Sequence, residues 1–236
     1  MTDLYILGAP DPEMAAIESL LTSAGQRIAY ALDPEGKRVH PGNAYAALMP
    51  IEVSRHLDDD GGHAVVLVEC CDAAARGTKL DPRIFRADHH RPGDPGYDKQ
   101  PAEFLSGSSL GQVIARLAAL DALPADWIRS RSTNFPIGRA GRFGVSDAGQ
   151  WAVGLPDDPP LIGEDAGGHP VSAGWLQAII PDTVVLIAAA DHCPGHAYAG
   201  LCHGVEPDVL LAWRMMSAAA FQEVRRQLAD RPKQED

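Results

Sequence analysis

The chain has 236 residues and a net charge of −12, from 20 basic and 32 acidic residues. Hydrophobic residues make up 45% of it and charged residues 22%, which is the mixture of a folded globular protein and excludes a disordered or fibrous chain. Because so acidic a chain repels other polyanions at long range, we expect neither a long nucleic acid nor a membrane surface among its partners.

Short apolar runs alternate with helical patterns in the first half of the chain. Clusters of apolar residues predict strands at residues 4–7, 27–32, 64–69 and 84–87. Apolar residues at helical spacing predict helices at 13–23 and 108–120, and a mixed, partly helical segment at 43–56. The stretch 91–101 is rich in Gly, Pro and Asp and is predicted to be a loop.

The second half of the chain begins with a change of character. Residues 134–174 are punctuated by Gly and Pro and contain two candidate hairpin strands, at 142–145 and 150–155. An uninterrupted apolar run at 183–190 predicts a further buried strand. An apolar stripe over 208–228 predicts a C-terminal helix.

Strands separated by helices are typical of an α/β fold, so we predict a doubly wound, mainly parallel sheet with a small β-rich insertion. The α/β domain would begin with residues 1–133, be interrupted by the insertion at 134–178, and be completed by the last strand and the C-terminal helix at 179–236.

The longest apolar run is far below the ~18 residues of a membrane-spanning helix. The first residues lack the basic region of a secretory signal, and the four cysteines lack disulfide-framework spacing, so we expect a reduced, cytoplasmic protein.

Acidic and histidine residues follow the predicted strands at the points where a parallel sheet would gather them. They are Asp11, Glu13, Glu69, Asp88, His89, His90, Asp191 and His192. Ligands of doubly wound sheets bind at the carboxyl ends of the strands. Carboxylate oxygens with imidazole nitrogens suit Mn²⁺, Fe²⁺ or Zn²⁺, and two such ions can clamp a phosphoryl group. Helix capping or water binding explains any one of the first three carboxylates alone, whereas three polar residues in a row after an apolar strand indicate a site.

The segment Ala87-Asp88-His89-His90-Arg91-Pro92 resembles the signature of the DHH phosphoesterase superfamily. That superfamily includes single-strand exonucleases, short-oligonucleotide nucleases, cyclic-dinucleotide phosphodiesterases and family II inorganic pyrophosphatases. The resemblance covers about residues 1–120. Its other parts are Pro10-Asp11-Pro12-Glu13 for the first motif, Glu69 for the second, and the pair Ser108-Ser109 opening a helix.

The resemblance implies an α/β enzyme with divalent metal, Mn²⁺ first among the candidates. The implied metal ligands are Asp11, Glu13, Glu69, Asp88, His89 and Asp191. Asp88 and His90 are the implied catalytic residues, with His90 beside the metal or in contact with phosphate.

Three positions depart from the family's pattern. Leu7 stands where the first motif has a histidine, and it cannot bind a metal. Glu13 and Glu69 stand where the family has aspartate, and each is longer by one methylene. These changes can move or remove one ion, so a site with two ions, one ion or none is left open.

Four further residues are candidates for contacts with substrate. Arg139 and Arg142 flank a glycine in a predicted loop, and guanidinium groups hold phosphate oxygens bidentately. His169, in a Gly-Gly-His stretch, is similar to the family's glycine-rich substrate loop, and His192 follows Asp191. The alternatives are a solvated surface for the arginines and a plain loop for the glycine-rich stretch.

Cysteine and histidine also recur near the end of the chain. Asp191-His192-Cys193, His196 and Cys202-His203 are residue types that suit zinc, in a spacing that matches no common zinc motif. We expect Cys193 and Cys202 to be core residues.

Three functions are compatible with these patterns. The first is a metal-dependent phosphoesterase, in which activated water attacks the phosphorus of a short oligonucleotide, cyclic dinucleotide or nucleotide. The second is a degenerate member that keeps the fold as a nucleotide-binding or protein-interaction module. The third is a different metal-dependent hydrolase that shares Asp-His-His by chance. A homodimer is a further expectation.

Overall fold

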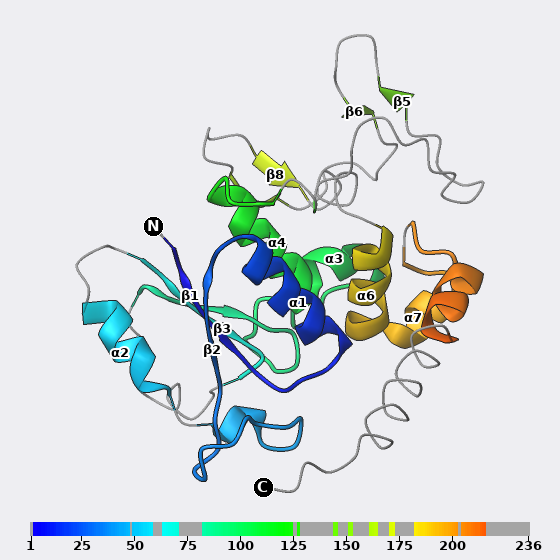
Figure 1. The fold of residues 1–236 in the computed structure, drawn as a ribbon. Coiled ribbons are helices and arrows are strands. Elements are labelled where there is room, and N and C mark those ends of the chain that lie inside the picture. The colour runs from blue at the N-terminus through cyan, green and yellow to red at the C-terminus, as the bar shows by residue number, and fades with distance from the viewer. Residues whose placement is uncertain are drawn as a thin grey trace, which may run out of the picture.

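A four-stranded parallel sheet, in the order β2-β1-β3-β4, forms the centre of the computed structural model (Figure 1). Its strands are β1 (Leu4–Leu7), β2 (Arg27–Tyr30), β3 (Val65–Val68) and β4 (Ile84–Ala87). This confirms the α/β fold and the four strands predicted in the first half of the chain. The structure describes residues 2–47, 49–58, 63–70, 82–124, 127, 144–145, 151–152, 161–164, 170–172, 182–202 and 204–215.

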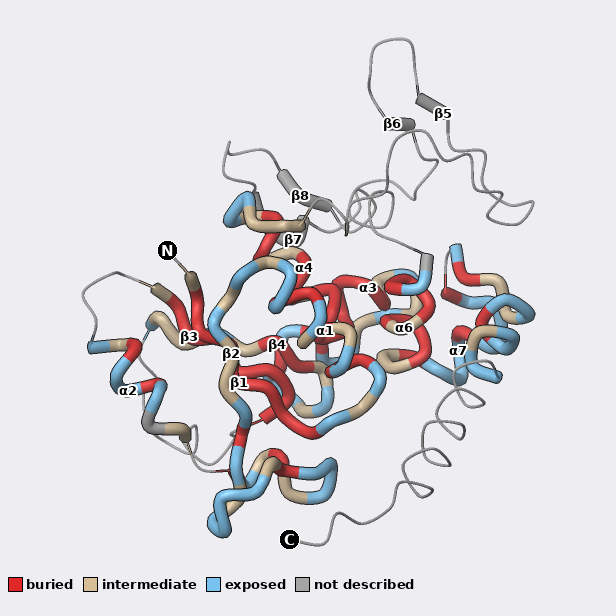
Figure 2. The backbone as a smooth tube through the Cα atoms, in the orientation of Figure 1, coloured by how far each residue is buried: buried red, intermediate tan, exposed pale blue. Residues whose placement is uncertain are grey.

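Helices cover both faces of the sheet because its two central strands are apolar on both sides. Tyr5 and Leu7 of β1 point to the face covered by α1 (Pro12–Ser23), α3 (Phe104–Gly107), α4 (Ser109–Ala119) and α6 (Asp182–His192). Leu4 and Ile6 point to the opposite face, covered by η1 (Ala44–Ala46) and α2 (Ile51–Asp58). All eight residues of β1 and β3 are buried (Figure 2), as expected for central parallel strands.

Two of the predicted helices begin at side chains that cap them. Asp11 Oδ1 accepts a hydrogen bond of 2.7 Å from the Met14 amide at the start of α1. Ser108 Oγ accepts one of 3.0 Å from the Gly111 amide at the start of α4. The predicted loop after β4 contains neither helix nor strand until η2 (Pro101–Glu103).

The prediction of a strand at 183–190 is wrong, because these residues belong to helix α6. This helix packs against α1, α3, α4 and α7 (Pro194–Tyr198), so most of its circumference is apolar. A helix buried on most sides loses the polar face from which helical periodicity is recognised, and it then resembles a buried strand. The last part of the chain therefore contributes helices: α6, α7 and a helix at 207–215, which overlaps the first part of the helix predicted at 208–228.

Short antiparallel pairs lie in the region predicted to be a β-rich insertion. The strands β5 (Gly144–Val145) and β6 (Trp151–Ala152) form one pair, and β7 (Leu161–Glu164) and β8 (Pro170–Ser172) form the other. The second pair lies against α4. In the part of the chain that the structure describes, no helix has the length and apolar character needed to cross a membrane.

Candidate metal centre

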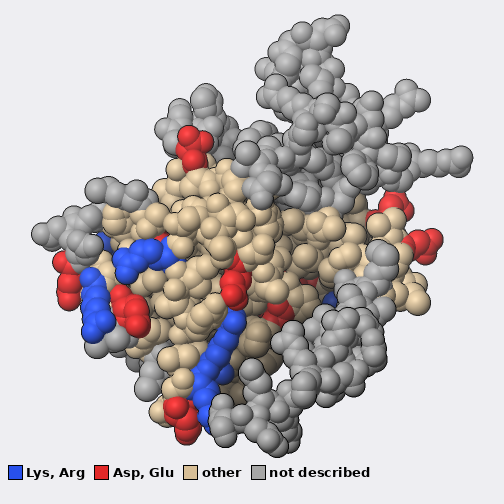
Figure 3. All heavy atoms as spheres, in the orientation of Figure 1, with Lys and Arg blue, Asp and Glu red and all other residues tan. Residues whose placement is uncertain are grey.

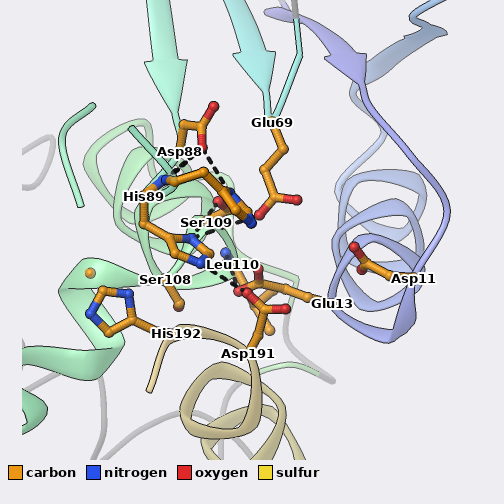
Figure 4. A network of polar contacts seen from close by, with 12 residues as sticks. Asp11, Glu13, Glu69, Asp88, His89, Ser108, Ser109, Leu110, Asp191 and His192 are labelled. Carbon is orange, nitrogen blue, oxygen red and sulfur yellow. Dashed lines mark hydrogen bonds and ion pairs between the residues drawn. The ribbon is translucent and has the colours of Figure 1, made fainter. Parts of the chain in front are cut away.

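The polar residues singled out in the sequence meet at the carboxyl edge of the sheet. The chain leaves β1 for β2 on one side, and β3 then joins β1 on the other side, so the direction of winding reverses between β1 and β3. Such a reversal opens a crevice in which the ligands of α/β proteins bind. The loops that follow β1, β3 and β4 and the end of α6 surround this position (Figure 4).

Four side chains from four elements converge there. Glu13 in α1, Glu69 after β3, His89 after β4 and Asp191 in α6 each offer a ligand atom, and these atoms all lie within 4.8 Å of one another. His89 Nε2 lies 3.2 Å from Asp191 Oδ2, and His89 Nδ1 lies 3.8 Å from Glu69 Oε1. The set consists of three carboxylates and one imidazole, and these donors suit a divalent cation.

Two buried carboxylate oxygens of this cluster lack a hydrogen-bond donor among the described residues. Glu13 and Glu69 are buried, and Glu13 Oε2 and Glu69 Oε1 have no hydrogen-bond partner among the described residues. The other oxygen of Glu13, Oε1, accepts a hydrogen bond of 3.0 Å from the Leu110 amide. Buried carboxylate oxygens without a donor cost free energy, and a bound cation would remove that cost. The residues therefore fit a metal ion.

Burial and mutual repulsion set the protonation of the cluster. Burial, together with the negative charge of Asp191, raises the pKa of Glu13 well above its usual value. The same two causes raise the pKa of Glu69, against a hydrogen bond from the Ser109 hydroxyl. Burial would also raise the pKa of Asp191, but its contacts with His89 and Glu13 outweigh burial and lower it.

Asp88 organises the loop after β4 instead of facing the cluster. Its Oδ1 accepts hydrogen bonds from the Tyr45 hydroxyl (2.9 Å), the His89 amide (2.7 Å), and the His90 amide and Nδ1 (both 3.1 Å). Burial opposes ionisation of Asp88, but these hydrogen bonds outweigh it and lower its pKa. Asp88 belongs neither to this cluster nor to a second group of candidate metal ligands, which consists of Glu69, His89 and His90. Its side chain points away from the cluster in Figure 4.

His90 stands at the edge of the same cluster, with its ring stacked on that of His89 at a centroid distance of 4.2 Å. The hydrogen bond to Asp88 raises the pKa of His90 to about 9, so the ring is positively charged at neutral pH. A ring nitrogen of His90 lies within 4.8 Å of ligand atoms of Glu69 and His89. Its side chain is 45% exposed, which leaves it open to a ligand.

Asp11 and His192 lie near the cluster but belong to neither group of candidate ligands. One oxygen of Asp11 is used in capping α1, and burial raises the pKa of this carboxyl. The His192 ring meets that of His89 edge-on, at 5.0 Å between centroids, and its Nε2 donates to the Lys99 carbonyl at 3.4 Å. Burial lowers the pKa of His192. A Cβ on Gly107 would come within 2.6 Å of this ring, so the ring packs directly on α3.

The structure also assigns contacts to residues that the sequence did not single out as site residues. Tyr45 reaches Asp88 from 43 positions earlier in the chain, and no local pattern marks it. Ser109 Oγ lies 3.4 Å from His89 Nδ1, and its place in the serine pair was the signal that could have identified it. Leu7 is fully buried in the core. The candidates Arg139, Arg142 and His169 lie outside the described residues.

Comparisons with protein-family models, with curated proteins and with solved structures found no match to this chain. The chemistry of the metal centre is therefore inferred from its own geometry. That geometry shows buried acidic and histidine side chains that could bind a metal ion.

Proposed function

We propose that this protein is a metal-dependent phosphoesterase that hydrolyses a small phosphorylated substrate, with chemistry similar to that of DHH enzymes. The observation that carries the proposal is the cluster of Glu13, Glu69, His89 and Asp191, whose ligand atoms lie within 4.8 Å of one another. The cluster stands beside a positively charged histidine, His90. A cation with an adjacent positive side chain is suited to a phosphate group, which carries negative charge on several oxygens.

One Mn²⁺ ion is the occupant that the residues favour. Mn²⁺ accepts both carboxylate oxygens and imidazole nitrogens. A second ion on the side of β1 is disfavoured, because Leu7 is buried and apolar there and one oxygen of Asp11 is engaged in capping α1. Among the described residues, we assign the four clustered side chains as the ligands of this ion.

The protein's own residues would bind and polarise the substrate. When bound, the ion supplies positive charge to a phosphoryl oxygen and lowers the pKa of a water molecule. His90 contacts the phosphate and stabilises the negative charge that develops in the transition state. Asp88 keeps the His90 ring in place and charged, and Tyr45 holds Asp88 through its hydroxyl.

A small substrate agrees with the charge of the molecule. On the face shown in Figure 3, described Lys and Arg side chains lie beside Asp and Glu side chains and form no continuous basic stripe. The net charge of −12 adds long-range repulsion for a polyanion. A short oligonucleotide, a cyclic dinucleotide or a nucleotide carries few charges and is held by local contacts.

The test is hydrolysis of bis-p-nitrophenyl phosphate and of a short oligonucleotide with added Mn²⁺. Asp191→Asn removes a metal-binding charge and should abolish both turnover and Mn²⁺ binding. His90→Asn cannot carry a positive charge and should lower kcat by about 10²–10³-fold while Mn²⁺ binding persists. The exposed Asp208→Asn is the matched control and should behave as wild type. Equal turnover in wild type and Asp191→Asn would overturn the proposal.

A binding module is the second candidate function, and the buried Leu7 favours it. An apolar core residue at the position of a family metal ligand is consistent with a fold kept after loss of catalysis. This alternative predicts that the wild type binds Mn²⁺ and a nucleotide by calorimetry but hydrolyses neither phosphate substrate.

A further inference from the structure

Two buried cysteines face each other directly beyond the end of α6. Cys193 Sγ and Cys202 Sγ are 2.8 Å apart, with one thiol donating a hydrogen bond to the other. The exposed fraction is 8% for Cys193 and 2% for Cys202, so the pair is enclosed in the core around α6 and α7.

Backbone hydrogen bonds hold the two cysteines together. The Cys193 carbonyl accepts from the Ala197 amide at 2.9 Å at the start of α7, and the Leu201 amide donates to the His196 carbonyl at 2.9 Å. The Cys202 carbonyl accepts from the Val205 amide at 3.1 Å. The segment is thus folded back on itself, and the approach of the two sulfur atoms follows from its backbone.

We propose that Cys193 and Cys202 are a redox modification site, which closes to an intramolecular disulfide when the protein meets a peroxide. The sulfur atoms need to approach by only about 0.8 Å to reach the disulfide bond length. The bond would join the C-terminal end of α6, the helix that carries Asp191, to the segment after α7. The pair does not contribute to the proposed hydrolysis, so the proposal stands apart from that function.

The chemistry needs one equivalent of peroxide and balances in two steps. Cys202 releases its proton, its thiolate attacks an oxygen of hydrogen peroxide, and the O–O bond breaks to give Cys202 sulfenic acid and hydroxide. The hydroxide takes up the released proton and leaves as one water. The Cys193 sulfur then attacks the Cys202 sulfur, the S–O bond breaks, and a second water leaves with the Cys193 proton. Two thiols are oxidised, and the peroxide is reduced to two water molecules.

Intact-mass spectrometry of the folded full-length chain, treated with hydrogen peroxide, tests the proposal. We expect a loss of about 2 Da, which dithiothreitol reverses. Non-reducing peptide mapping should show one cross-link, between Cys193 and Cys202. The oxidised protein should also melt at a higher temperature than the reduced one, since the bond restrains the unfolded chain.

Matched variants separate this pair from the other cysteines. Cys193→Ser and Cys202→Ser should each eliminate the 2 Da loss, whereas Cys70→Ser should retain it. Cys70 is a suitable control because it is also buried and its thiol donates to the Ile6 carbonyl at 3.4 Å. A wild-type protein that stays fully reduced, or that cross-links through Cys70, would overturn the proposal. The wild-type map decides the question even if a serine variant fails to fold.

Discussion

At the scale of single residues, Glu69 combines an unfavourable backbone conformation with a buried carboxyl group, and both cost folding free energy. Its φ of 49° lies in the left-handed region, which glutamate rarely adopts. Its carboxyl is buried, and Oε1 lacks a hydrogen-bond partner among the described residues. Strain of this kind costs on the order of 1–3 kcal/mol and persists where the surrounding structure imposes it, often at functional sites. A cation bound by Glu69 would offset this cost.

Replacing Glu69 by glutamine should separate stability from metal binding. Glu69→Gln keeps the size of the side chain and removes a charge that Glu13 and Asp191 repel. We expect the metal-free variant to melt at a higher temperature than the wild type and to gain nothing from Mn²⁺. Calorimetric melting with EDTA and with Mn²⁺ measures both effects, and the exposed Glu35→Gln is the control. A variant that is less stable than the wild type in EDTA would contradict the argument.

His56 predicts a pH dependence of stability away from the metal centre. It is buried, its Nδ1 lies 2.9 Å from Arg27 Nη1, and its Nε2 lies 3.2 Å from the Ala64 carbonyl. Burial, helped by the charge of Arg27, lowers the pKa of His56 below 6.5.

The unfolded chain therefore takes up a proton at His56 more readily than the folded one. The contribution of His56 to stability is complete above pH 6.5 and is lost as the pH falls through the lower pKa of the folded state. His56→Gln should lose less stability than the wild type over this interval in urea unfolding. Parallel pH profiles for the two proteins would show that His56 does not cause the dependence.

At the scale of elements, the ends of β1 and β3 approach so closely that only glycine fits between them. A Cβ on Gly8 would collide with the Glu69 carbonyl oxygen and would lie 2.9 Å from that of Val68. The neighbours are backbone atoms, which cannot move aside without shifting a strand. The position of the Glu69 carboxylate thus depends on the absence of a side chain one residue after β1.

Gly8→Ala should therefore weaken both the fold and the metal centre. Overpacking of this kind typically costs about 1–3 kcal/mol of unfolding free energy. The shift of Glu69 should also lower the affinity for Mn²⁺, as measured by isothermal titration calorimetry. Gly195→Ala is the matched control, because a Cβ there meets nothing within 4 Å. Unchanged affinity in Gly8→Ala would show that the strand ends adapt without moving Glu69.

At the scale of the whole molecule, a bound ion would connect parts of the chain that are far apart in sequence. The clustered ligands come from α1, from the ends of β3 and β4, and from α6. Without an ion, three carboxyl groups are held together against their mutual repulsion. A ligand that binds only the folded state stabilises it by mass action.

Mn²⁺ at 100 times its dissociation constant should raise the unfolding free energy by about 2.7 kcal/mol. Asp191→Asn should lose this gain, while Asp208→Asn keeps it, as measured by thermal unfolding at several Mn²⁺ concentrations. An equal gain in Asp191→Asn would place the ion elsewhere in the protein.

Local patterns determined the sheet and the position of the site. The four strands and the loop after β4 depend on residues adjacent in sequence, and their sequence predicts each of them. The caps of α1 and α4 are equally local, but they are seen only in the structure. The run Asp88-His89-His90 marked the carboxyl edge because polar residues directly after an apolar strand are unusual. His89 indeed lies in the cluster with Glu13, Glu69 and Asp191.

Only the tertiary structure decided which of these side chains meet. Asp88 and His89 are adjacent in sequence, yet Asp88 turns to Tyr45 while His89 faces Asp191. The direction of each side chain follows from the backbone of the loop, which sequence periodicity does not describe. The apolar run of α6 predicts a strand because neighbours surround this helix, and burial on most sides erases the polar face that distinguishes a helix. Short-range chemistry thus determined the sheet, whereas long-range packing determined which side chains cluster at the candidate metal centre.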